Sequence, residues 1–527
     1  MKRFLLVFLA AAVCAGQDRA SSYTIAGTVT DSVSGQPSAR VRVVLAPAER
    51  PTSELSSGIT AGDGRFHFEV SKGKYQLRAE RNGLPGQPYG AESIFSGFGI
   101  AIIAGPGQNT ANIVFAVHPP STISGIVLDE AGDPVENAIV QLMYVQVVAG
   151  RKSVSTLGWG RTNDLGEYRF SGLASGEYYI AVTGKPWYVS SPHSAPDDPA
   201  SGSEIVRAAF VPAFYPNTAD PRAAAPIEVK PGQDAVASFS LFTKPGFALT
   251  VECESCSGKQ MRLDLISEGV SGTQAFHRTE YIRGRSVMPA ISPGMYTVKI
   301  SNQDMGTPLV ATATADLTAA DAEVVLTPQE SARVSGQVTL QNADPRLLSR
   351  MFISLRSEDF RTPSFSREIA PDGTFQIPVS WPGRFRLWIT GVPGVFASRV
   401  TSEDSAFQNG VLTIGDGTLV KLNVVASGGM GRVSGFVRRN DSPASGVLVV
   451  LASAALPADP GWYLGFKTDS DGSFDFKNVR PGDYRLFAVN NTELEYANPG
   501  AIRPYLEAAK PLLVEMNGVL DVDLELP

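Results

Sequence analysis

The stretch that decides the fold lies near the end of the 527-residue chain and contains three short segments. They read VSGFV at Val433–Val437, DGSFDF at Asp471–Phe476 and PGDYRL at Pro481–Leu486. Asp-Gly and Pro-Gly dipeptides favour tight turns. The alternation after each turn places aromatic and apolar side chains on one face of a strand. The stretch therefore predicts short strands joined by turns, each with one buried face.

The same segments recur along the chain, so the sequence is a repeat. The first segment returns in three earlier places, at Ile25–Val29, Ile123–Val127 and Val334–Val338. Gly27 and Gly125 are 98 residues apart, and Gly336 and Gly435 are 99 apart. The interval between Gly125 and Gly336 is 211 residues, which leaves room for one more unit. That divergent unit shows only the last segment, at Pro293–Val298.

We therefore predict an all-β chain, a tandem array of about five antiparallel β-sandwich domains of the prealbumin-like or immunoglobulin-like type. The predicted boundaries are 1–21 for a signal peptide and short linker, then 22–119, 120–244, the divergent 245–329, 330–430 and 431–527. The second unit carries a Pro-rich insertion at 185–226. Long loops of this kind are often functional or mobile, and the alternative is a loop packed on its own sandwich.

The motifs resemble the carboxypeptidase regulatory-like domain. The resemblance covers four units well and the third loosely, and it implies a prealbumin-like sandwich related in shape to Cna B-type and starch-binding-like modules. As a whole, the chain resembles bacterial exported proteins built of such repeats. The family motifs are fold signatures, so no catalytic residue carries over. The first strands lack the core lysine of Cna B-type domains, so we predict no isopeptide crosslink.

The N-terminus has the pattern of a secretory signal. Lys2 and Arg3 precede the apolar run Phe4–Val13, and small residues allow cleavage after Ala15. A lipoprotein anchored at Cys14 is a minor alternative. No later segment is long and apolar enough to span a bilayer, so we expect no transmembrane segment in the mature chain and a secreted, periplasmic or cell-surface location.

Two cysteines remain after cleavage, Cys253 and Cys256, spaced C-x-x-C. This spacing is compatible with a redox pair, half of a zinc site or a local disulfide. The flanks have strand patterning, and no second pair of metal ligands accompanies it. We favour the disulfide, which suits an oxidising compartment and closes too small a loop to stabilise much.

Other chemistry is not indicated by the sequence. Lys and Arg number 45 against 52 Asp and Glu, without a basic stripe, so nucleic-acid binding is not expected. The four histidines are not spaced as metal ligands, and no nucleophile-elbow or phosphate-loop motif occurs. Thr468–Gly472 resembles the start of a Ca²⁺ loop, but Phe474 and Arg480 occupy the sixth and twelfth places. We therefore predict no cofactor, no metal and no catalytic residue.

Aromatic residues in loops could form a platform for sugar rings. The candidates are Trp187, Tyr188, Trp462 and Tyr463, and the alternative is that they anchor loops or cores. We expect the repeat tyrosines Tyr75, Tyr178, Tyr296 and Tyr484 to be structural, with rings packed inward.

The leading hypothesis for function is a non-catalytic exported binding or scaffold protein, with polysaccharide as its ligand. The alternative is a structural or adhesive envelope protein that binds other proteins. A hydrolase with a site in the 185–226 loop is the least favoured of the three hypotheses.

Overall fold

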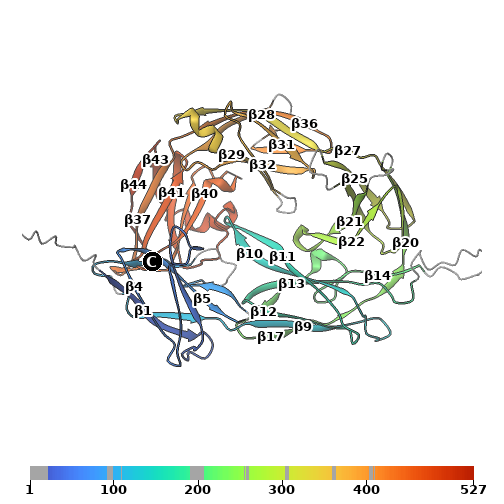
Figure 1. The fold of residues 1–527 in the computed structure, drawn as a ribbon, viewed down its shortest axis with the longest axis horizontal. Helices are drawn as coiled ribbons and strands as arrows, with labels where there is room; N and C mark the ends of the chain where they lie inside the picture. Colours follow the sequence, from blue (N-terminus) through green and yellow to red (C-terminus); the bar gives the residue numbers. More distant parts are fainter. Residues whose placement is uncertain are drawn as a thin grey trace, which may run out of the picture.

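The chain is built almost entirely of β-strands. In the part of the chain that the computed structural model describes, they form five two-sheet sandwiches, which we number 1 to 5 (Figure 1). The described residues are 22–526 apart from 83, 92–98, 109, 190–206, 254–255, 257–259, 303–307, 359–363, 403–406, 409 and 458. The predicted signal peptide, its cleavage at Ala15 and the alternative lipidation of Cys14 lie outside them. The all-β sandwich class predicted from the repeat is confirmed.

The strands of each sandwich follow one another in the sequence. Sandwich 1 contains β1 (Tyr23–Asp31), β2 (Arg42–Pro47), β3 (Ser56–Ile59), β4 (Arg65–Val70), β5 (Gly73–Arg81), β6 (Leu84–Pro88), β7 (Ile102–Ala104) and β8 (Ile113–Val117). Sandwich 2 contains β9 (Ser121–Leu128), β10 (Ile139–Val148), β11 (Arg151–Arg161), β12 (Glu167–Leu173), β13 (Gly176–Thr183), β15 (Ala213–Phe214), β16 (Ile227–Val229), β17 (Asp234–Val236) and β18 (Phe239–Ser240). Beside it lie a small sheet and a 3₁₀ turn, namely β14 (Ala208–Phe210), β19 (Thr243–Pro245) and η2 (Pro221–Ala223).

Sandwich 3, the divergent unit, contains β20 (Phe247–Cys253), β21 (Met261–Glu268), η3 (Val270–Gly272), β22 (Gln274–Ile282), β23 (Arg285–Ile291), β24 (Met295–Ser301), β25 (Leu309–Asp316), β26 (Ala322–Leu326) and β27 (Gln329–Glu330). Sandwich 4 contains β28 (Ala332–Gln341), η4 (Pro345–Arg350), β29 (Phe352–Ser357), β30 (Phe365–Glu368), β31 (Thr374–Val379), β32 (Gly383–Thr390), β33 (Phe396–Ser402), β34 (Phe407–Gln408), β35 (Val411–Ile414) and β36 (Leu419–Ser427). Sandwich 5 contains β37 (Gly431–Arg439), β38 (Ser442–Pro443), β39 (Leu448–Ser453), η5 (Pro460–Trp462), β40 (Tyr463–Lys467), β41 (Ser473–Val479), β42 (Gly482–Val489), α1 (Pro499–Ile502), η6 (Arg503–Tyr505), β43 (Lys510–Val514), β44 (Val519–Asp521) and β45 (Leu524–Glu525).

One pairing pattern repeats in every sandwich. The first strand pairs antiparallel with the strand that follows the turn, as β1 does with β4, and parallel with the closing strand, as β1 does with β8. The corresponding parallel pairs are β9 with β17, β20 with β26, β28 with β36, and β37 with β44. The sandwiches are therefore not wholly antiparallel, because the chain returns from the second sheet to lie beside its first strand in the same direction.

Steric crowding explains why the first segment of the repeat carries a glycine. A Cβ built on Gly435 would lie 2.1 Å from the carbonyl oxygen of Val522 on the closing stretch, and any side chain would collide there. A Cβ built on Gly27, Gly125 or Gly336 would likewise lie 2.0, 1.9 or 1.9 Å from a carbonyl oxygen of the closing stretch. The glycine therefore lets the two parallel strands approach closely. In sandwich 3, β20 has no glycine.

The four repeat tyrosines are buried, and each phenol donates a hydrogen bond to the carbonyl four residues earlier. The distances from Oη are 3.0 Å for Tyr75 to Ser71, 2.7 Å for Tyr178 to Ala174, 2.8 Å for Tyr296 to Ser292, and 2.9 Å for Tyr484 to Arg480. Burial also raises the pKa of Tyr178, Tyr296 and Tyr484. The prediction that these tyrosines are structural is confirmed.

The described part of the Pro-rich insertion packs on its own sandwich. Strand β15 adds to β13, and β14 pairs with β19. Phe210 and Ala213 are buried in the core of sandwich 2, which explains why this stretch is ordered despite its prolines. Residues 190–206 of the insertion lie outside the described part.

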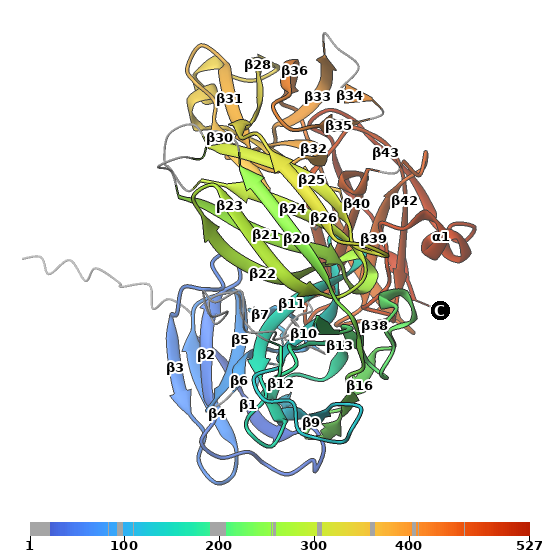
Figure 2. The same ribbon diagram turned by 90° about the vertical axis from the view of Figure 1, so that its right-hand side faces the viewer.

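The five sandwiches follow one another around a closed ring, which is seen face-on in Figure 1 and from the side in Figure 2. Arg207, in the insertion, forms an ion pair of 2.6 Å with Asp321 of sandwich 3. Lys299 of sandwich 3 lies over the ring of Trp381 in sandwich 4. Direct contacts between neighbours therefore fix their orientation at these joints.

Sandwich 5 closes the ring by contacting sandwich 1. Asp469, in the turn before β41, forms an ion pair with Lys74 of β5. The next residue, Ser470, donates its N–H to Ala101 O at 2.9 Å, and Lys467 Nζ donates to Gly90 O at 2.5 Å. The acidic turn that resembles the start of a Ca²⁺ loop is therefore a docking element between the first and last sandwiches.

Candidate functional site

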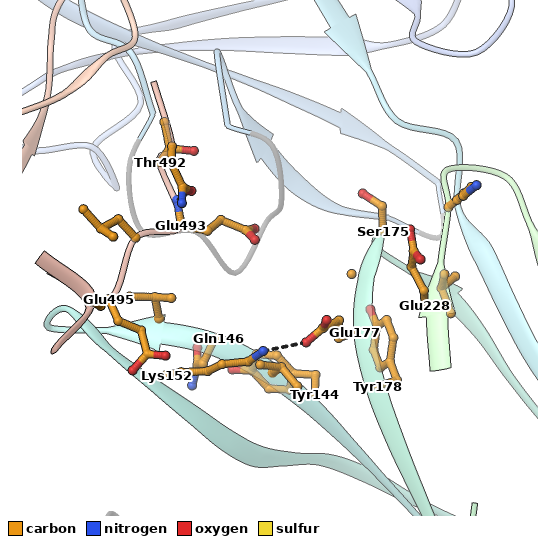
Figure 3. A pocket seen from close by; sticks show the side chains of 18 of the residues that line it. Tyr144, Gln146, Lys152, Ser175, Glu177, Tyr178, Glu228, Thr492, Glu493 and Glu495 are labelled. Carbon is orange, nitrogen blue, oxygen red and sulfur yellow. Dashed lines mark hydrogen bonds and ion pairs between the residues drawn. The ribbon is translucent and has the colours of Figure 1, made fainter. Parts of the chain in front are cut away.

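A groove of about 630 Å³ lies between sandwiches 2 and 5 (Figure 3). Sandwich 2 supplies side chains from β10, β11, β13 and β16, and sandwich 5 supplies the loop that follows β42. Figure 3 shows Thr492 and Glu493 on one side, Ser175 and Glu228 on the other, and the Lys152–Glu177 pair between them. The groove exists only because the two sandwiches are held together.

Tyr496 anchors the loop of sandwich 5 to its neighbour. Its ring packs against Gly150, in the β10–β11 turn, and against Gly465 of β40, where a Cβ would lie 2.5 and 2.6 Å from ring atoms. The following residue, Ala497, donates its N–H to Gly150 O at 2.9 Å. Burial raises the pKa of Tyr496 to about 12, so the phenol stays neutral. The anchor fixes the position of Glu493 and Glu495 in the groove wall.

Charged side chains of both signs and uncharged polar side chains line the groove. Lys152 Nζ donates to Glu177 Oε2 at 2.9 Å, and this bond raises the pKa of Lys152. The lining contains four glutamates and two lysines, namely Glu177, Glu228, Glu493, Glu495, Lys152 and Lys230, so it carries a negative balance. The lining also contains the hydroxyls of Tyr144, Ser175 and Thr492 and the amides of Gln146 and Asn491, whereas the hydroxyl of Tyr178 already donates to Ala174 O. The lining therefore presents hydrogen-bond donors and acceptors side by side.

The predicted aromatic platform is split between two environments. Trp187 is 87% exposed and stands edge-to-face with Tyr188, with the two ring centroids 5.6 Å apart. Tyr463 is only 3% exposed, and its hydroxyl donates to Pro457 O at 2.8 Å. Trp462 is half-buried, with the Arg480 guanidinium 5.3 Å from its ring centroid. None of the four lines the groove of Figure 3.

Sequence reasoning missed the groove because its residues come from four strands and one distant loop. No motif joins Lys152 and Glu177 to Glu493. The one local signal was the connection after β42, a polar stretch from Asn490 to Asn498 that ends in a capped turn, where Asn498 Oδ1 accepts the N–H of Gly500.

Cys253 and Cys256 form a disulfide, with their Cα atoms 5.5 Å apart at the end of β20. Among the described residues, no group of three or more His, Cys, Asp and Glu side chains is arranged to hold a metal ion. In the same residues, no helix has both the length and the apolar character that crossing a bilayer requires.

Residues 24–92 match the family model described as the carboxypeptidase regulatory-like domain. The predicted resemblance is confirmed. The match covers most of sandwich 1, and the other sandwiches repeat its strand pairing. No curated protein matches the chain.

Several solved structures are similar in part. They include the Bacillus anthracis TIE protein, at 12% identity over 79% of this chain and 76% of that one, with a TM-score of 0.17. The minor pilin GBS52 of Streptococcus agalactiae is 11% identical over 42% of this chain and 97% of that one, with a TM-score of 0.23. The shaft pilin SpaA of Lactobacillus rhamnosus GG is 12% identical over 43% of this chain and 98% of that one, with a TM-score of 0.17. At these scores the likenesses carry no functional argument.

Proposed function

We propose that the chain is a non-catalytic, exported binding and scaffold protein that holds a polysaccharide in the groove between sandwiches 2 and 5. The observation that carries this proposal is the groove itself, a concave site lined by carboxylates, amides and hydroxyls from two sandwiches. Sites of about 300–1,000 Å³ are typical of small ligands and of segments of larger ones.

The chemistry of the lining suits sugar. Each sugar hydroxyl both donates and accepts a hydrogen bond, so carboxylates such as Glu493 and amides such as Gln146 pair with it directly. Hydrogen bonds to charged acceptors are stronger than those between neutral groups. Tyr144, which is half-buried, adds aromatic surface for the C–H face of a sugar ring. The ring of sandwiches would hold both walls at a fixed separation.

The secretory pattern at the N-terminus supports an exported protein, which meets polysaccharide in the envelope or outside the cell. The repeat architecture supports a scaffold, since each sandwich contributes contacts to its neighbours and no sandwich carries a separate catalytic motif. Fold alone does not assign the ligand, so the groove has to be tested directly.

Binding of the full mature chain to a broad glycan array, followed by titration calorimetry on the hits, tests the proposal. Glu493 is exposed in the groove, and Glu493→Ala is expected to weaken binding about tenfold because a charged acceptor is lost. Glu507 is exposed in the same sandwich outside the groove, and Glu507→Ala is the matched control. The proposal is contradicted if no glycan on the array binds, or if both variants lose the same affinity.

A second candidate function, a structural or adhesive protein that binds protein partners, is favoured by exposed apolar residues on closing strands. Val114 on β8, Val236 on β17 and Val325 on β26 are 63%, 70% and 52% exposed. In the described part of the chain these strands lie at sheet edges, where an added strand can pair. Cross-linking in the native envelope that yields one reproducible protein neighbour, together with no glycan binding, would favour this function.

A further inference from the structure

A second cavity, of about 530 Å³, lies where sandwiches 2, 4 and 5 meet. Its charge is opposite to that of the groove in Figure 3. Four arginines and one carboxylate line it, namely Arg151, Arg356, Arg386, Arg480 and Glu358. A basic cavity at a junction of three sandwiches is not needed to fold any one of them.

Arg386 is the buried member of this set. It lies on β32 and is 9% exposed, and its Nη2 donates to Glu358 Oε1 at 2.5 Å. Glu358 is shared, because Arg384 Nη2 lies 3.0 Å from its other oxygen. Among the described residues, the buried Nε of Arg386 has no hydrogen-bond partner. A buried donor without an acceptor is costly, and a ligand oxygen would remove the cost.

Trp388 holds two further guanidinium groups at the cavity. The Cζ atoms of Arg356 and Arg480 lie 4.8 and 5.7 Å from the centroid of its ring. Stacking fixes the plane of a guanidinium and leaves its edge free to donate. Arg480 also donates to Asp459 at 3.1 Å, whereas Arg356 has no acceptor among the described residues.

The cavity forms where sandwich 5 packs against sandwiches 2 and 4. A Cβ on Gly461 of sandwich 5 would lie 2.8 Å from Trp388 Cη2 of sandwich 4, so this glycine permits the contact. Apolar residues such as Val392 and Phe396 complete the wall beside Tyr463. The cavity thus offers directed cationic donors next to apolar surface.

We propose that this junction binds the anionic group, a carboxylate or a sulfate ester, of an acidic saccharide, with Arg356 and Arg386 as the principal donors. Planar guanidinium edges match two oxygens of one anionic group, and the apolar wall contacts the C–H face of the sugar. The inference rests on the proposed saccharide-binding function and adds the charge of the ligand. The acidic groove would take the uncharged hydroxyl-bearing part, because its own carboxylates repel anions.

Titration calorimetry of the full mature chain tests this with matched probes. Oligogalacturonate should bind, and the same oligomer with methyl-esterified carboxylates should bind about tenfold or more weakly, because the charged acceptor is gone. A sulfated dextran oligomer distinguishes a sulfate ester from a carboxylate. An oligoglutamate peptide tests an acidic protein partner, and binding of this peptide alone would overturn the proposal.

The variants separate this site from the groove. Arg356 is exposed, so Arg356→Gln should fold, and we expect it to lose about tenfold or more of the affinity for the acidic oligomer alone. Arg346→Gln, at a fully exposed arginine of the same sandwich, is the control. If acidic and esterified oligomers bind equally and only Glu493→Ala weakens them, the saccharide function stands and the anion site is wrong. If no glycan binds at all, both proposals fail.

Discussion

Lys299 Nζ of sandwich 3 lies 3.2 Å from the centroid of the Trp381 ring of sandwich 4. The lysine is 5% exposed on β24, and burial lowers its pKa to about 8, against the opposing attraction of Asp264 and Asp416. A desolvated ammonium over an indole face is attracted by the ring electrons, which offsets part of the cost of burial. The joint between these sandwiches therefore contains a titratable cation.

The lowered pKa of Lys299 predicts that the free energy of unfolding rises at alkaline pH. Its folded pKa of about 8 lies below the ordinary 10.5, so between these values the unfolded chain holds a proton that the folded chain has lost. Stability then rises with pH across this window and is lowest below it, where the burial cost reaches about 3 kcal/mol. We expect Lys299→Met to be the more stable protein at pH 7 and to lose this advantage near pH 10. Urea unfolding at both pH values measures it, and a difference independent of pH would refute it.

The Lys74–Asp469 pair predicts a pH-dependent closure of the ring. The Asp469 side chain is 5% exposed, and burial raises its pKa, although Lys74 opposes the shift. A raised carboxyl pKa contributes stability at acid pH that is lost as pH rises through the folded pKa. At neutral pH the buried carboxylate therefore depends on Lys74, and its removal should cost about 3 kcal/mol.

We expect Lys74→Met to enlarge the radius of gyration at pH 7 in small-angle scattering, and acid pH to reverse the change. Asp469→Asn, which carries no charge at either pH, should change it less. Lys72→Met is the control, since Lys72 is exposed in the turn before β5. A compact Lys74→Met protein at pH 7 would show that the other contacts close the ring without the pair.

The sequence predicts what each sandwich does alone and not what it does to its neighbours. The structural roles of Gly435 and Tyr484 could be predicted, because the same steric demand and the same local hydrogen bond recur along the repeat. The parallel pairing of the closing strand could not be predicted. Alternation of apolar and polar residues identifies the buried face of a strand but not the direction in which it pairs. The groove and the ring closure depend on pairs such as Lys74 and Asp469, which are distant in the sequence and occur once.

Gly435 predicts that a single methyl group disrupts its sandwich. In Gly435→Ala the new Cβ would lie 2.1 Å from Val522 O, so the closing strand has to move and its pairing with β37 is weakened. We expect a loss of about 2 kcal/mol or more in the free energy of unfolding. Gly58→Ala is the control, because nothing lies within 4 Å of its Cβ position in β3 and surface changes usually stay within about 0.5 kcal/mol. Equal effects of the two changes would remove the steric explanation for the repeat glycine.

The hydroxyl of Tyr484 is expected to contribute less than its ring. Tyr484→Phe removes the 2.9 Å bond to Arg480 O and should cost about 1 kcal/mol, whereas Tyr484→Ala opens a cavity and should cost about 3–5 kcal/mol. Sandwich 4 supports this division, because Phe385 occupies the same place, fully buried and without a hydroxyl. Chemical unfolding of both variants gives the two values. A Tyr484→Phe protein as unstable as Tyr484→Ala would mean that the corner hydrogen bond, rather than the aromatic core, holds the end of β42.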